Sequence, residues 1–146
     1  MKEMELKIPE LLEQGPLVEA EIFTNATSFL NIKNKDGFEK YSRVKMLIDT
    51  GSNISGLDQN IIHQLSLKQY KGDDIVNGVG GSYAIKRYSC ILFLPIFKDK
   101  GLPIDILAGE YQDAPFQGIL GRDVLQYCHF TYDGKNNTYI ISAADI

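Results

Sequence analysis

The part of this 146-residue sequence best suited to chemistry is residues 46–54, MLIDTGSNI. An apolar run leads directly into Asp49, and a charge at the inner end of a core strand is costly unless it is hydrogen-bonded or paired. Gly51 permits a tight turn that leaves backbone N–H groups close to the carboxylate. The segment therefore predicts either a catalytic carboxylate or an Asp that only caps a corner between a strand and a turn.

A second segment, residues 77–83 (NGVGGSY), has three glycines in four residues between two strand-like stretches. A phosphate-binding loop is disfavoured, because no Lys-Ser or Lys-Thr follows and the next residues favour a strand over a helix. A plain tight turn and a mobile flap that closes over a ligand remain as alternatives. A third segment, residues 118–125 (GILGRDVL), has by itself the pattern of a common junction between a strand and a helix.

The hydrophobic pattern predicts many short strands that position these segments. Strands are expected over 16–23, 41–48, 75–79, 83–94, 102–108 and 116–120, a short helix over 58–65 with Asp58 as its N-cap, one or two helical turns over 122–128, and a hairpin of 130–132 and 138–142. Residues 1–15 are expected to form a separate leader, helical or loose, and residues 16–146 a single domain. We expect deletion of residues 2–14 to raise activity or leave it unchanged.

Composition excludes several classes of protein. Apolar residues make up 44% and charged residues 23% of the 16.4 kDa chain, as in soluble globular domains. No stretch approaches the roughly 20 apolar residues of a membrane span, and no signal peptide is visible. The net charge is −4 and the Lys and Arg residues are scattered, so no nucleic-acid partner is expected.

The remaining reactive residues are expected to be structural. Cys90 and Cys128 lie in apolar runs and are expected to be buried thiols, which suits a reducing cytoplasm. His63 and His129 lack metal-ligand spacing, so neither a metal nor a cofactor is expected. Ser52 has no recognisable base partner that would make it a nucleophile.

Taken together and in this order, LIDTGS, GVGGSYAIKRY and GILGRDVL resemble the retropepsin family, the retroviral-type aspartic proteases. The long C-terminal hairpin is more similar to the cellular and bacterial single-domain branch than to the viral enzymes. The resemblance implies an all-β fold, a small closed barrel with a flap hairpin and one or two short helices. It also implies an aspartic endopeptidase that acts on extended peptide or protein substrates.

The resemblance implies roles for particular residues. The implied catalytic residues are Asp49, Thr50 and Gly51, and the implied substrate-binding residues are Ser52, Asn53, Gly78, Val79, Gly80, Gly81, Ser82, Ile119 and Leu120. Viral enzymes carry an Asp at the position of Asn53, and that Asp pairs with the Arg of the G-R motif. Arg122 therefore needs another partner, for which Asp58 and a backbone carbonyl are the two candidates.

Aspartic proteolysis needs two carboxyl groups that hold a water between them, and this chain has one D-T-G segment. The second Asp49 must come from a second copy, so the resemblance implies a homodimer. We expect an interface built from the Thr50 loops and the strand over 138–142, and a bell-shaped dependence of rate on pH with an optimum between about pH 4 and 6. The alternative is a retropepsin-like module for dimerisation or peptide binding that cuts little or nothing.

Overall fold

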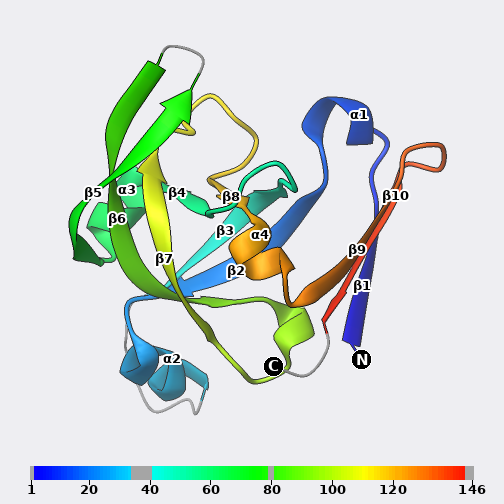
Figure 1. Ribbon diagram of the computed structural model, residues 1–146. Coiled ribbons are helices and arrows are strands. Elements are labelled where there is room, and N and C mark those ends of the chain that lie inside the picture. The colour runs from blue at the N-terminus through cyan, green and yellow to red at the C-terminus, as the bar shows by residue number, and fades with distance from the viewer. Residues whose placement is uncertain (1, 34–40, 79–80, 144–146) are drawn as a thin grey trace.

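The computed structural model describes residues 2–33, 41–78 and 81–143 and shows an all-β architecture (Figure 1). Its strands are β1 (Lys2–Lys7), β2 (Leu17–Phe23), β3 (Tyr41–Ile48), β4 (Gly56–Asp58), β5 (Lys68–Gly78), β6 (Gly81–Phe93), β7 (Leu102–Gly109), β8 (Gly118–Leu120), β9 (Cys128–Asp133) and β10 (Thr138–Ala143). Its helices are α1 (Leu11–Gln14), α2 (Ala26–Lys33), α3 (Gln59–Gln64), α4 (Arg122–Leu125) and the 3-10 turn η1 (Pro95–Phe97). The expected class is confirmed, but the described residues contain more helices than the one or two expected.

The larger sheet closes on itself. Its seven strands run in the order β2-β3-β8-β4-β7-β6-β5, and β2 also pairs with β6, so that all of them except β5 form a ring. The ring is filled by alternate side chains of its strands, as the alternating sequence pattern predicted for β2 and β3. Val18, Ala20 and Ile22 of β2 and Val44, Met46 and Ile48 of β3 are all buried.

A smaller sheet, in the order β1-β10-β9, packs beside the ring. Tyr139 and Ile141 of its central strand β10 are buried. The Tyr139 hydroxyl donates a hydrogen bond to the Leu17 carbonyl at 2.6 Å and accepts one from the Leu17 N–H at 3.2 Å, which joins the two sheets.

This sheet corrects one prediction and limits another. Residues 2–7 form strand β1, whereas the sequence analysis expected a helical or loose leader. Strand β10 pairs with β1 along one edge and with β9 along the other, so that both of its edges are occupied within one chain. Residues 138–142 therefore have no free edge for strand pairing with a second copy, and an interface through one face of this strand stays a prediction.

Short helices cover the ends of the ring. The Asp58 carboxylate accepts a hydrogen bond from the Asn60 N–H at 2.8 Å, which confirms Asp58 as the N-cap of α3. Helix α2 was not predicted, although Asn25 is a good N-cap and its side chain accepts a hydrogen bond from the Ser28 N–H at 2.8 Å. Phe29 of α2 packs edge-on against Phe23, with 5.1 Å between the ring centroids.

The two strands of the predicted flap hairpin are present as β5 and β6, which pair antiparallel up to Gly78 opposite Gly81. The backbone of Ser82 lies opposite that of Asn77 in the same ladder. The predicted flap-tip residues Val79 and Gly80 lie outside the described residues. No helix within 2–33, 41–78 and 81–143 is long and apolar enough to cross a membrane.

Candidate active site

The D-T-G segment forms a tight loop at the end of β3. The Asp49 N–H donates to the Leu120 carbonyl of β8 at 3.0 Å, which continues the parallel pairing of these two strands by one residue. Asp49 Oδ1 accepts a hydrogen bond from the Gly51 N–H at 2.9 Å, as the sequence predicted for a glycine at this turn. Asp49 is only half-buried, so the loop fixes the carboxylate through one oxygen and leaves it accessible from solvent.

The loop is tied to the start of α4 by Arg122. The guanidinium Nη1 of Arg122 donates a hydrogen bond to the Thr50 carbonyl at 2.7 Å, and the Arg122 N–H donates to the Ser52 carbonyl at 2.8 Å. Of the two candidate partners for this side chain, the backbone carbonyl is therefore confirmed and Asp58 is not the partner. Asp58 instead accepts hydrogen bonds from the Asn60 N–H and the Tyr111 N–H.

A second tie, which the sequence analysis missed, joins Asp123 to Ser55. Ser55 is fully buried. Its N–H donates to Asp123 Oδ2 at 2.9 Å, and its hydroxyl donates to Asp123 Oδ1 at 2.7 Å. The same hydroxyl accepts a hydrogen bond from the Gly121 N–H at 2.9 Å, so the segment that follows the Asp49 loop is bound to the junction between β8 and α4.

Close packing at this junction explains its glycine. A Cβ added to Gly121 would lie 2.9 Å from the Ser52 carbonyl oxygen and 3.0 Å from the Ile54 carbonyl carbon. Both neighbours are backbone atoms of the segment over 49–54 that contains the Asp49 loop, and they cannot move aside without displacing it. All three residues of the G-R-D segment over 121–123 therefore contact the segment over 50–55. Gly121 packs closely against its backbone, Arg122 donates a hydrogen bond to the Thr50 carbonyl, and Asp123 accepts hydrogen bonds from Ser55.

Two of the candidate substrate-binding residues belong to β8. Ile119 is half-exposed, whereas Leu120 is fully buried and supports the loop from behind through its carbonyl. The structure thus brings Asp49, Thr50, Gly51, Ser52, Asn53, Ile119 and Leu120 together, and Gly78, Gly81 and Ser82 belong to the hairpin of β5 and β6.

Tyr111, in the connection between β7 and β8, is a further residue near the loop that the sequence analysis missed. A Cβ added to Gly56 would lie 2.5 Å from the Tyr111 hydroxyl oxygen, so the phenol occupies the space above a glycine of β4. Burial raises the pKa of Tyr111 above its usual value, and the negative charges of Asp58 and then Asp49 add to the effect. The phenol therefore lies within the electrostatic influence of Asp49 and stays protonated at neutral pH.

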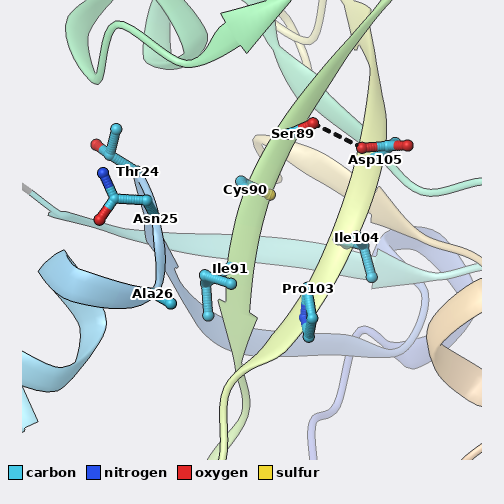
Figure 2. A pocket seen from close by; sticks show the side chains of 9 residues that line it. All are labelled: Thr24, Asn25, Ala26, Ser89, Cys90, Ile91, Pro103, Ile104 and Asp105. Atoms are coloured by element: carbon cyan, nitrogen blue, oxygen red, sulfur yellow. Dashed lines mark hydrogen bonds between the residues drawn. The ribbon is translucent and has the colours of Figure 1, made fainter. Parts of the chain in front are cut away.

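An open pocket of about 400 Å³ lies elsewhere, over β6, β7 and the start of α2 (Figure 2). Its lining residues are Thr24, Asn25, Ala26, Ser89, Cys90, Ile91, Pro103, Ile104 and Asp105, none of which belongs to the predicted site. Cys90 is buried, and desolvation, followed by the charges of Asp105 and Asp123, raises its pKa to about 12. This thiol is therefore a poor nucleophile, because the thiolate is the reactive form.

Cys128, His63 and His129 are not among the residues of the candidate site. Cys128 is half-buried rather than buried as expected, and burial raises its pKa to about 11. His63 and His129 are exposed. In the part of the chain that the structure describes, no three His, Cys, Asp or Glu side chains are grouped so that they can hold a metal ion.

We predict that Asp123→Ala destabilises the fold by about 3 kcal/mol, because the carboxylate accepts hydrogen bonds from the Ser55 N–H, the Ser55 hydroxyl and the Val124 N–H. Urea unfolding monitored by circular dichroism measures this change. Asp133→Ala is the matched control, since Asp133 bonds only within an exposed hairpin loop, to Asn136. A loss below about 1 kcal/mol in Asp123→Ala would show that the tie to Ser55 contributes little.

Comparison with known proteins identifies the family of this chain. Residues 12–132 match the sequence profile of the retroviral aspartyl protease family, RVP, and the match covers most of the chain. The closed sheet with a D-T-G loop at the end of β3 is the fold of an aspartic protease of the retropepsin type. The chain belongs to the retroviral aspartyl protease family.

Solved structures share this fold at low sequence identity. A retropepsin-like aspartic protease from Rickettsia conorii aligns with a TM-score of 0.57 and 17% identity, over 96% of this chain and 98% of that protein. The EIAV protease complexed with the inhibitor HBY-793 aligns with a TM-score of 0.51 and 23% identity, over 79% of this chain and 88% of that protein. No curated protein sequence matched the chain.

Proposed function

We propose that this chain is a homodimeric aspartic endopeptidase whose active site contains two Asp49 residues, one from each copy. Membership of the retroviral aspartyl protease family supports a protease in general. The observation that carries the specific proposal is the geometry of the Asp49 loop. The Gly51 N–H binds one oxygen of a half-buried carboxylate, while Arg122 and Asp123 tie the loop to the body of the chain.

The chemistry follows from two carboxyl groups that share one proton. One Asp49 is ionised and takes a proton from a water held between the two groups, and the oxygen of that water attacks the peptide carbonyl carbon. The other Asp49 is protonated and donates its proton to the carbonyl oxygen, which gives a tetrahedral intermediate. The peptide C–N bond then breaks as the amine nitrogen takes the proton that the first Asp49 accepted from water, and a hydroxyl of the intermediate returns a proton to the second Asp49 as the carboxylic acid product forms.

The neighbouring residues have positioning roles in this proposal. Thr50 meets its counterpart across the two-fold axis and holds the two loops together, and Gly51 allows close approach of the substrate. An extended peptide lies between the loop and the hairpin of β5 and β6, which covers it. Ser52, Asn53 and Ile119 line the groove, while Leu120 supports the loop from the core side.

The proposal is tested by cleavage of a denatured protein and a peptide library between about pH 4 and 6, with and without a pepstatin-type inhibitor. We expect cleavage that the inhibitor suppresses and a bell-shaped dependence of the rate on pH. Absence of inhibitor-sensitive cleavage across this range would contradict the protease and favour a module that only binds peptides or dimerises.

A further inference from the structure

One face of the ring carries a row of half-exposed apolar side chains beside Asp49, hereafter the apolar row. It consists of Leu47 of β3, Ile119 of β8 and Leu107 of β7. The sheet register pairs Leu47 with Ile119, and it pairs Gly56 of β4 with both Ile119 and Leu107, so all four share a face of the sheet. Asp49 continues the pairing of β3 by one residue, so its side chain lies on the face of Leu47.

Gly56 has no side chain, so the apolar row has a gap at β4, and the ring of Tyr111 lies over that gap. A Cβ added to Gly56 would lie 2.5 Å from the Tyr111 hydroxyl oxygen, and a Cβ added to Gly109 would lie 2.9 Å from the ring carbon Cε2. Gly109 follows Leu107 by two residues in β7, so it lies on the same face. The phenol therefore extends from β7 to β4 across this face, with its hydroxyl over Gly56.

Contacts of both its backbone and its ring hold Tyr111 in this position. Its N–H donates a hydrogen bond to Asp58 Oδ2 at 3.2 Å, and its carbonyl accepts one from the Ala114 N–H at 3.1 Å. Its ring packs against that of Phe116, with 5.9 Å between the centroids and 54° between the planes. A side chain fixed in this way presents a preformed surface to whatever binds beside it.

Core packing alone does not account for the hydroxyl of Tyr111. The residue is half-exposed, and within 2–33, 41–78 and 81–143 its hydroxyl has no hydrogen-bond partner. The hydroxyl of buried Tyr139, in contrast, bonds to both the N–H and the carbonyl of Leu17. Burial and the charges of Asp58 and Asp49 raise the pKa of Tyr111, so its hydroxyl keeps its proton at acid and neutral pH. It is therefore available to donate a hydrogen bond to a bound peptide.

From this placement we infer that Tyr111 determines which peptides the site accepts. Its ring fills the part of the groove over β4, so the substrate side chain directed there is small, as in Gly, Ala or Ser. Its hydroxyl donates a hydrogen bond to a Ser oxygen at that position, which favours Ser over Ala. The inference rests on the proposed function, since it concerns the substrate of the same site.

The spacing of the strands indicates which substrate position is selected. Strand β4 is two strands away from β3 in the sheet, and neighbouring strands lie about 4.8 Å apart, so the Tyr111 hydroxyl is about 10 Å from the line of β3 and Asp49. An extended peptide rises about 3.3 Å per residue, so the selected side chain lies about two or three residues from the cleaved bond. In a homodimer one Tyr111 faces each half of the peptide, so the selected position occurs on both sides of that bond.

The first test is digestion of a peptide library made from a denatured proteome, with the cleavage sites identified by mass spectrometry. For the wild type we expect Gly, Ala and Ser to be favoured over Leu and Phe by at least about 10-fold at the selected position. Tyr111→Ala opens the space over Gly56, so we expect it to lower this ratio by at least about 10-fold. Tyr132→Ala is the matched control, since it removes the same ring from a 48% exposed position on β9 and is expected to leave the profile unchanged. The thermal midpoint of each variant verifies that the fold is retained.

A second variant, Tyr111→Phe, separates the ring from its hydroxyl. The phenylalanine ring still fills the space over Gly56, so we expect the preference for small side chains to remain. The hydrogen bond is lost, so kcat/KM for peptides with Ser at the selected position is expected to fall by about 3-fold or more relative to the same peptides with Ala. If Tyr111→Phe relaxed the size preference as much as Tyr111→Ala, the volume of the ring would not be what selects the substrate.

A binding measurement lets this inference and the proposed function fail separately. The Asp49→Asn chain and the double variant Asp49→Asn/Tyr111→Ala are immobilised and exposed to the same library, and the retained peptides are identified by mass spectrometry. Because neither variant is expected to cleave, retention reports peptide selection without catalysis.

The possible outcomes of the two measurements are distinct. If the wild type cleaves but shows no preference for small residues, or if Tyr111→Ala keeps the wild-type profile, the role of Tyr111 is overturned and the protease stands. If the wild type does not cleave, the proposed function is contradicted. The role of Tyr111 is then supported by peptides that share a small residue when retained by the Asp49→Asn chain and lose it with the double variant, and any other result, including no retention, overturns it.

Discussion

Replacing Asp49 with Asn is expected to reduce cleavage by at least about 1000-fold while leaving the fold nearly unchanged. The amide has the size of the carboxyl group, and its oxygen can still accept the hydrogen bond from the Gly51 N–H that Asp49 Oδ1 accepts in the structure. It can neither take a proton from water nor share one with the second copy. The measurements are kcat/KM on a cleaved peptide and the thermal midpoint of the same preparation.

The matched control for this loss is Asp105→Asn. Asp105 is also half-buried and accepts a hydrogen bond, from the Ser89 hydroxyl at 2.8 Å, but it lines the pocket of Figure 2 and not the Asp49 loop. We expect less than about a 3-fold change in kcat/KM from this variant. If Asp49→Asn retained more than about 1% of wild-type activity, Asp49 would not be the carboxyl group that activates water.

The features that local sequence pattern determines were predictable. Alternation of apolar and polar residues located β2 and β3, because one face of each strand lines the filled ring. Asp58 was recognised as an N-cap because its side chain needs to reach only Asn60, two residues along the chain. The turn at Gly51 was predictable for the same reason, since the Asp49 carboxylate accepts its hydrogen bond from the Gly51 N–H, also two residues along the chain.

The features that depend on distant residues were not predictable from pattern. Ser55 and Asp123 are 68 residues apart and meet only because β3 and β8 are neighbours in the sheet. The partner of Arg122 is a carbonyl, which every residue carries, so no side-chain type could identify it. Strand β1 has a weak alternation of charged and apolar residues, and its position is set by β10, at the other end of the chain.

Deletion of residues 2–14 is now expected to prevent stable folding, contrary to the expectation from sequence that it is harmless. The deletion removes all of β1, whose six residues pair with β10 from Lys2 opposite Ala143 to Lys7 opposite Thr138. It also removes Leu11 from the core and uncovers an edge of β10, beside the buried Tyr139 and Ile141. Circular dichroism and yield of soluble protein measure the result, and a deletion variant that unfolds cooperatively with unchanged stability would contradict it.

Two point substitutions in α1 test separately how much this segment contributes to stability, because Leu11 is buried and its neighbour Leu12 is exposed. Leu11→Ala is expected to cost about 2–5 kcal/mol of unfolding free energy, since Leu11 is fully buried and its truncation leaves a cavity. Leu12→Ala is expected to change the unfolding free energy of the monomer by less than about 0.5 kcal/mol, since Leu12 is 84% exposed. Unfolding is measured at a protein concentration low enough that dimer formation adds nothing to stability. Equal effects of the two substitutions would mean that Leu11 does not anchor α1 in the core.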